Sequence, residues 1–136
     1  MTQEPMHPLR AILNGMTDAW QRDRAGSQMT LGALIGALEA LPADRDITGF
    51  GGPHSYRGYY EDLAFEPSEA VQTVADLLAT CRGCMGRVFE GYKGGEYVMG
   101  EITPVWIALY GTTGPRLMAL DTDSDPIRPV TAEEEW

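Results

Sequence analysis

The chain has 136 residues, of which 43% are hydrophobic and 22% charged, a composition typical of one soluble globular domain. Its formal net charge of -10, from 20 acidic and 10 basic residues, argues against a protein that grips duplex DNA through many contacts to phosphate. No apolar run reaches the roughly 18 residues of a membrane span. Residues 1–10 also lack the pattern of a signal peptide, so we expect a cytoplasmic protein that does not bind membranes.

Residues 1–28 are predicted to form a tail followed by an amphipathic helix. Apolar side chains recur at helical spacing between residues 8 and 24: Leu9, Ile12, Leu13, Met16, Ala19 and Trp20. A single α+β domain is expected from residue 29 to residue 120. Its first helix begins at Thr30, a good N-cap, and extends to Leu41, where Pro42 stops it.

After this helix we expect a strand over residues 47–50, a Gly-rich loop over 51–58 and a second strand over 59–65. Another helix begins at Thr73, and its sequence TVADLLATCRGC matches TLGALIGALEAL at an offset of 43 residues (73 minus 30). A Gly/Tyr/basic cluster follows each helix. The similarity indicates either a degenerate α-β-β duplication or two uses of a common helix-to-strand transition.

Two further strands, over residues 102–111 and 116–121, are expected to pair as a hairpin. Residues 121–136 contain two prolines and many acids, so they are predicted to be an extended or mobile tail. The architecture is then α+β, with two or three helices packed on one face of a mostly antiparallel sheet of four or five strands. The uncovered face of such a sheet favours a homo-oligomer.

Cys81 and Cys84 form the CxxC of the chain, near the end of the second predicted helix. A zinc site would need four ligands, and the remaining candidates are His7 and His54. Thiolates at a helix end gain nothing from the helix dipole, which disfavours a redox pair. We therefore expect buried helical thiols, with zinc as the alternative, and no cofactor.

The stretch from residue 49 to 67, GFGGPHSYRGYYEDLAFEP, and the shorter GYKGGEY at 91–97 predict a polar, aromatic binding site. Tyrosine rings stack on bases, Arg57 and Lys93 would contact phosphate, and His54 and Glu61 would add polar contacts. The expected ligand-binding residues are His54, Tyr56, Arg57, Tyr59, Tyr60, Glu61, Tyr92, Lys93 and Tyr97. The alternative is that these clusters build tight hairpins whose tyrosines are half-buried strand residues.

Catalytic signatures are missing from the sequence: it contains no GxSxG, HExxH or Walker A motif, and no GxGxxG placed after a strand. His54 is the only credible catalytic histidine, and Glu61 and Asp62 would point to opposite faces of a strand. We therefore expect a binding protein rather than an enzyme. Nucleotide cleavage that depends on His54 is the less favoured alternative.

Four segments of the chain resemble small phage and prophage proteins of unassigned function, and together they cover most of residues 29–120. These segments are TLGALIGALEALPAD, SYRGYYEDLAFEP, GYKGGEYVM and TPVWIALYG. By analogy of lifestyle and chemistry, small phage proteins include counter-defence sponges that bind cyclic nucleotides or cyclic ADP-ribose derivatives, often as oligomers. The resemblance implies a phage protein that sequesters a nucleotide-type immune signal in the host cytoplasm. One alternative is an inhibitor that binds a host defence enzyme directly. Another is a DNA mimic, which the scattered placement of the acidic residues disfavours.

Overall fold

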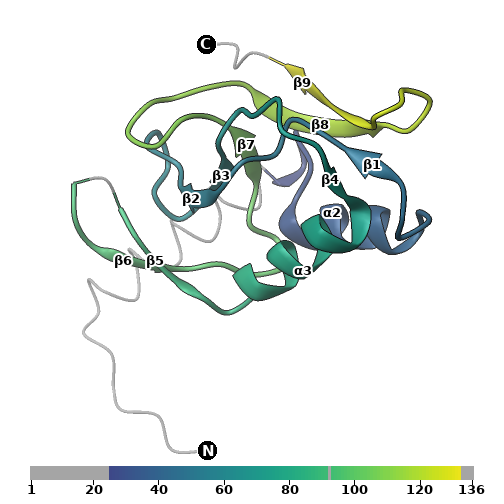
Figure 1. Cartoon of the computed structure of the whole chain (residues 1–136). Coiled ribbons are helices and arrows are strands. Elements are labelled where there is room, and N and C mark those ends of the chain that lie inside the picture. Colours follow the sequence, from purple (N-terminus) through teal and green to yellow (C-terminus); the bar gives the residue numbers. More distant parts are fainter. Residues whose placement is uncertain (1–24, 92, 133–136) are drawn as a thin grey trace, which may run out of the picture.

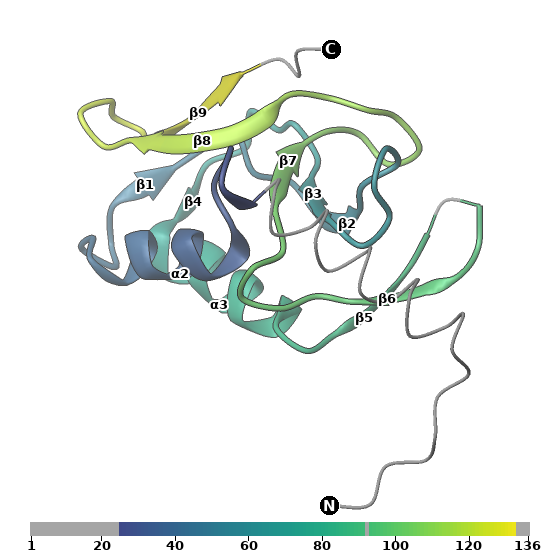
Figure 2. The same cartoon turned by 180° about the vertical axis from the view of Figure 1, so that it is seen from behind.

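The computed structural model describes residues 25–91 and 93–132, and it has the predicted α+β architecture (Figures 1 and 2). Its helices α2 (Leu31–Glu39) and α3 (Val74–Cys84) pack against each other. The strands are β1 (Asp46–Ile47), β2 (Pro53–Ser55), β3 (Leu63–Phe65), β4 (Gln72–Thr73), β5 (Val88–Glu90), β6 (Glu96–Val98), β7 (Val105–Ile107), β8 (Arg116–Asp121) and β9 (Arg128–Ala132). The helix predicted between residues 8 and 24 lies outside the described residues. Within the described ranges, no helix has the length and apolar character needed to cross a membrane.

The largest sheet has five strands in the order β2-β3-β7-β8-β9. Only the β3–β7 pair is parallel, so the prediction of a mostly antiparallel sheet of four or five strands is confirmed. Two further pairs, β1–β4 and β5–β6, form separate antiparallel ribbons. In both views α2 and α3 lie on the same side of the large sheet, and the β5–β6 ribbon extends away from them (Figures 1 and 2).

Both helices begin at the threonines that the sequence indicates. The side-chain oxygen of Thr30 accepts a hydrogen bond from the backbone N–H of Ala33 at 3.1 Å, and that of Thr73 accepts one from Asp76 at 3.2 Å. These bonds satisfy N–H groups that have no partner inside the helix. The buried positions recur three or four residues apart and face the core: Leu31, Leu34 and Leu38 in α2, and Val74, Leu77, Cys81 and Cys84 in α3.

The thiols of Cys81 and Cys84 are free and buried on the core face of α3. Burial, with a smaller contribution from Cys84, raises the pKa of the Cys81 thiol to about 12. Burial also raises the pKa of Cys84, although Arg87 nearby opposes the shift. The interpretation of this CxxC as a pair of buried helical thiols is confirmed.

The strand predicted over residues 59–65 is shorter in the structure, because residues 56–62 form a turn. The backbone N–H of Tyr56 donates to the carbonyl of Asp62 at 3.0 Å, and that of Asp62 donates to Tyr59 at 2.8 Å. Only β3 remains of the strand, and it pairs with β2, which lies inside the segment predicted as a Gly-rich loop. Glu61 and Asp62 are thus turn residues and not opposite faces of a strand.

The boundary predicted after residue 120 is wrong, because residues 121–132 continue the domain. Ile127 is fully buried, its N–H donates to the carbonyl of Asp46 and its carbonyl accepts from Thr48, both at 2.9 Å. β9 then pairs with β8 at the edge of the sheet. Pro129 is tolerated there because an edge strand leaves one side of its backbone without a ladder partner. The acidic composition of residues 121–136 favoured the prediction of a tail, although Ile127 is buried and anchors the segment.

Candidate functional site

His54 is turned into the fold rather than toward solvent. Its ring lies on β2, with Nδ1 2.8 Å from the carbonyl oxygen of Ser55 and Nε2 2.7 Å from that of Ala108. The ring is only 7% exposed and meets Tyr110 edge to face, with 5.3 Å between centroids. Both ring nitrogens therefore face backbone acceptors. This placement suits a residue that fixes the turn after β7 and does not suit a ligand contact or a catalytic base.

Tyr56 and Arg57 serve the same turn. Tyr56 is 1% exposed and stacks on Trp106 at a centroid distance of 4.1 Å, and its hydroxyl donates to the carbonyl of Gly114 at 3.0 Å. Arg57 Nη1 donates to the carbonyl of Gly111 at 2.7 Å. The expectation that Tyr56 lines a ligand pocket is wrong, because Trp106 and the core cover its ring. Arg57 has at least one hydrogen bond to its own chain, which restricts it as a phosphate contact.

Tyr59 and Asp62 both contact Trp106. The rings of Tyr59 and Trp106 are 6.1 Å apart and inclined by 29°. The indole N–H of Trp106 donates to Asp62 Oδ2 at 3.0 Å, and both of these residues are fully buried. Glu61, next to this pair, is half-buried in the turn. The carboxylate of Asp62 therefore holds the indole in the core.

The Gly/Tyr-rich segments 49–67 and 91–97 contact each other through the rings of Tyr60 and Tyr97, whose centroids are 5.9 Å apart. A Cβ added at Gly91 would lie 3.2 Å from the ring of Tyr60 and 3.0 Å from that of Tyr97, so glycine lets both rings pack on this backbone. Lys93 is exposed on the loop between β5 and β6. Tyr92 lies outside the described residues. As ligand contacts, Tyr59, Tyr60, Glu61, Lys93 and Tyr97 stay predictions.

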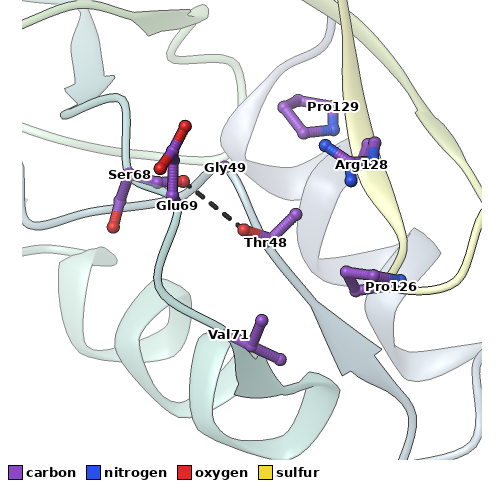
Figure 3. Close-up of a pocket in the computed structure, with 8 residues that line it drawn as sticks. All are labelled: Thr48, Gly49, Ser68, Glu69, Val71, Pro126, Arg128 and Pro129. Carbon is purple, nitrogen blue, oxygen red and sulfur yellow. Dashed lines mark hydrogen bonds between the residues drawn. The ribbon is translucent and has the colours of Figure 1, made fainter.

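A cavity of about 480 Å³ opens elsewhere, between the chain after β1, the segment before β4 and the start of β9 (Figure 3). It is lined by Thr48, Gly49, Ser68, Glu69, Val71, Pro126, Arg128 and Pro129. The Thr48 hydroxyl lies 3.1 Å from the carbonyl of Ala70, and the Gly49 N–H donates to the carbonyl of Ser68 at 2.9 Å. These bonds fix one wall of the cavity against the other.

Gly49 forms the narrow point of this wall. Its φ is +91°, and a Cβ there would lie 2.5 Å from Cδ of Pro129, so only glycine lets β9 approach so closely. Exposed Arg128 lies on the β9 side and exposed Glu69 on the other side (Figure 3). The cavity therefore combines a guanidinium and a carboxylate with apolar proline surfaces.

A second cavity of about 460 Å³ adjoins the first. The two share Gly49, Ser68, Glu69 and Pro129. The remaining walls of the second cavity are mostly apolar: Pro67, Ile107, Pro115 and Thr131. Together they make a groove with a polar end at Arg128 and an apolar end above Ile107.

Sequence reasoning did not find this groove. Its walls come from segments about 20 and 60 residues apart along the chain, and Arg128 was assigned to a tail. The signal present was the pattern DPIRP, in which Pro126 and Pro129 bracket one apolar and one basic residue. Rigid prolines around a buried isoleucine are unusual for a mobile tail, but the partner strand could not be identified from the pattern alone.

A third cavity, of about 450 Å³, lies between α2 and α3, where Arg82 and Glu39 form an exposed ion pair at 2.7 Å. Among the residues that the structure describes, no group of three or more His, Cys, Asp or Glu converges in a way that could hold a metal ion. Comparisons of the chain with protein-family models, with curated proteins and with solved structures each find no match.

Proposed function

We propose that the protein binds a small, anionic, nucleotide-type ligand in the cavity of Figure 3 and holds it without converting it. The observation that carries the proposal is that Arg128 and Glu69 face one cavity of about 480 Å³, within the usual range of about 300–1,000 Å³ for ligand pockets. A guanidinium binds phosphate through paired N–H donors. A carboxylate across the cavity can accept hydrogen bonds from ribose hydroxyls or base amino groups.

The placement of the candidate catalytic groups supports sequestration over cleavage. His54 has a backbone carbonyl at each ring nitrogen, so neither nitrogen is directed at the groove or at solvent. Cys81 and Cys84 are buried, and their raised pKa values disfavour the thiolate that a nucleophile needs. His54, Cys81 and Cys84 thus have structural surroundings that disfavour a catalytic role.

The resemblance of residues 29–120 to phage proteins directs this proposal to a biological role. A small phage protein that retains a cyclic nucleotide or a cyclic ADP-ribose derivative would remove a host immune signal by mass action. Such a protein needs affinity and abundance, and it needs no turnover. A homo-oligomer in the host cytoplasm is part of this proposal.

The test is a thermal-shift screen with cyclic di- and trinucleotides, cyclic ADP-ribose isomers, NAD and ordinary nucleotides, followed by calorimetry on any ligand found. A ligand at 100 times its dissociation constant stabilises the protein by about 2.7 kcal/mol. Arg128→Ala should weaken binding roughly tenfold to a hundredfold, because a charge-assisted hydrogen bond contributes about 1.5–3 kcal/mol. Arg82→Ala is the matched control, since it removes the same charge from α3, and it should bind normally.

Four results would overturn the proposal: equal losses in both variants, loss in Arg82→Ala alone, recovery of a degraded ligand after the protein is denatured, or no shift across the panel. The last result would favour the alternative of a protein inhibitor. Its candidate surface is the β5–β6 ribbon, where the paired residues Val88 and Val98 are 51% and 63% exposed.

A further inference from the structure

The groove has two unlike compartments that meet at a shared rim. Arg128 lines only the first cavity, and Ile107 and Pro115 line only the second. Ser68 and Glu69 line both, so they lie where the compartments join. A ligand that fills the whole groove therefore has an anionic end, a middle with hydrogen-bond donors and an apolar end.

Building on the proposed function, we propose that the ligand is a nucleoside phosphate, bound with its phosphate at Arg128 and its base in the apolar compartment. The phosphate would accept from the Arg128 guanidinium. The ribose would then lie at the rim, where the Glu69 carboxylate accepts from its hydroxyl groups. The base would pack between Ile107, Pro115 and Pro129, surfaces that favour a flat ring through apolar contact.

Residues of β9 line both compartments. Thr131 lines the apolar compartment and its neighbour Val130 lines neither cavity, as expected for successive residues of a strand, whose side chains alternate between faces. Arg128, the first residue of β9, lines the polar compartment, and Thr131, three residues later, lines the apolar one. One strand can thus contact both ends of one ligand.

The experiment compares three probes by calorimetry: a nucleoside 5′-monophosphate, ribose 5-phosphate and the unphosphorylated nucleoside. The nucleotide should bind at least tenfold more tightly than either fragment. Thr131→Phe fills the apolar compartment and should weaken nucleotide binding at least tenfold while leaving ribose 5-phosphate unchanged. Val130→Phe adds the same ring at the neighbouring residue, which lines neither cavity, and should have no effect on either probe. Glu69→Gln should reduce, by about tenfold, the preference for the nucleotide over its 2′,3′-dideoxy analogue, because a neutral amide is the weaker acceptor.

The outcomes separate this inference from the proposed function. If ribose 5-phosphate binds as tightly as the nucleotide and Thr131→Phe has no effect, the two-compartment orientation is wrong although anion binding at Arg128 stands. If Thr131→Phe and Val130→Phe weaken binding equally, the effect is structural and the orientation is also wrong. If none of the three probes binds to the native chain, the inference fails, and the proposed function fails with it only if the cyclic nucleotides, cyclic ADP-ribose isomers and NAD of the thermal-shift panel also give no shift.

Discussion

Gly49 and Gly36 give opposite predictions for the same substitution. Gly49 has a φ of +91°, and its Cβ would collide with Pro129, whereas a Cβ at exposed Gly36 in α2 meets no atom within 4 Å. Gly49→Ala should therefore lower the free energy of unfolding by about 1–3 kcal/mol. Gly36→Ala should raise it by about 0.5–1 kcal/mol, since alanine is the better helix former. Urea titrations followed by far-UV circular dichroism measure both. Two shifts of the same sign would contradict the close approach of β9 to Gly49.

Individual residue roles were predicted well where they depend on neighbours in sequence and poorly where they depend on distant ones. The sequence indicates that His54, Tyr56 and Arg57 are polar groups held by glycine-rich backbone. Their partners are backbone carbonyls 54, 58 and 54 residues away, which no local pattern identifies. The alternative that such clusters build turns describes these three residues better than the prediction of a ligand pocket.

At the scale of elements, the position of Cys81 and Cys84 on the buried face of α3 determines how readily their thiols react. Because burial raises the pKa of Cys81 to about 12, its thiol should stay protonated in the folded protein at pH 8. We expect labelling by a thiol reagent at that pH to be at least a hundredfold slower than in urea, where the chain is unfolded. The raised pKa also means that this thiol favours the folded state below the unfolded pKa near 9, and that this contribution is lost as pH rises from about 9 to 12. Rapid labelling of the native protein would show that α3 opens or that its core face is exposed.

The helices were predicted almost to the residue because their signals are local: a threonine cap, an apolar repeat and a stop. The strands were predicted less well because they are short and mostly paired across long separations. β1 has two residues, and its partner β4 follows 25 residues later. A strand of this length carries no alternation of its own, so only the paired structure reveals it.

At the scale of the whole molecule, the chain is closed by its C-terminal strand. Ile47 and Ile127 form a parallel bridge, and Arg45 donates to the carbonyls of Thr122 and Ser124 at 2.9 and 3.1 Å. These contacts join residues about 80 positions apart and place β9 beside Gly49. The groove exists only because these contacts bring Arg128 to the segment before β4, so the last strand must fold for the groove to form.

The contacts of residues 121–132 with the rest of the domain lead to a prediction about unfolding. Ile127→Ala removes a fully buried side chain and should lower the free energy of unfolding by about 2–5 kcal/mol. Val130→Ala, on the same hairpin but 43% exposed, should change it by less than about 1 kcal/mol. If β9 belongs to the domain, the Ile127→Ala protein should still unfold in one transition, with coincident near-UV and far-UV circular dichroism. An early transition that leaves most of the secondary structure intact, or equal effects of the two variants, would make residues 121–132 a detachable tail. Arg128 could not then be the fixed wall of a binding site.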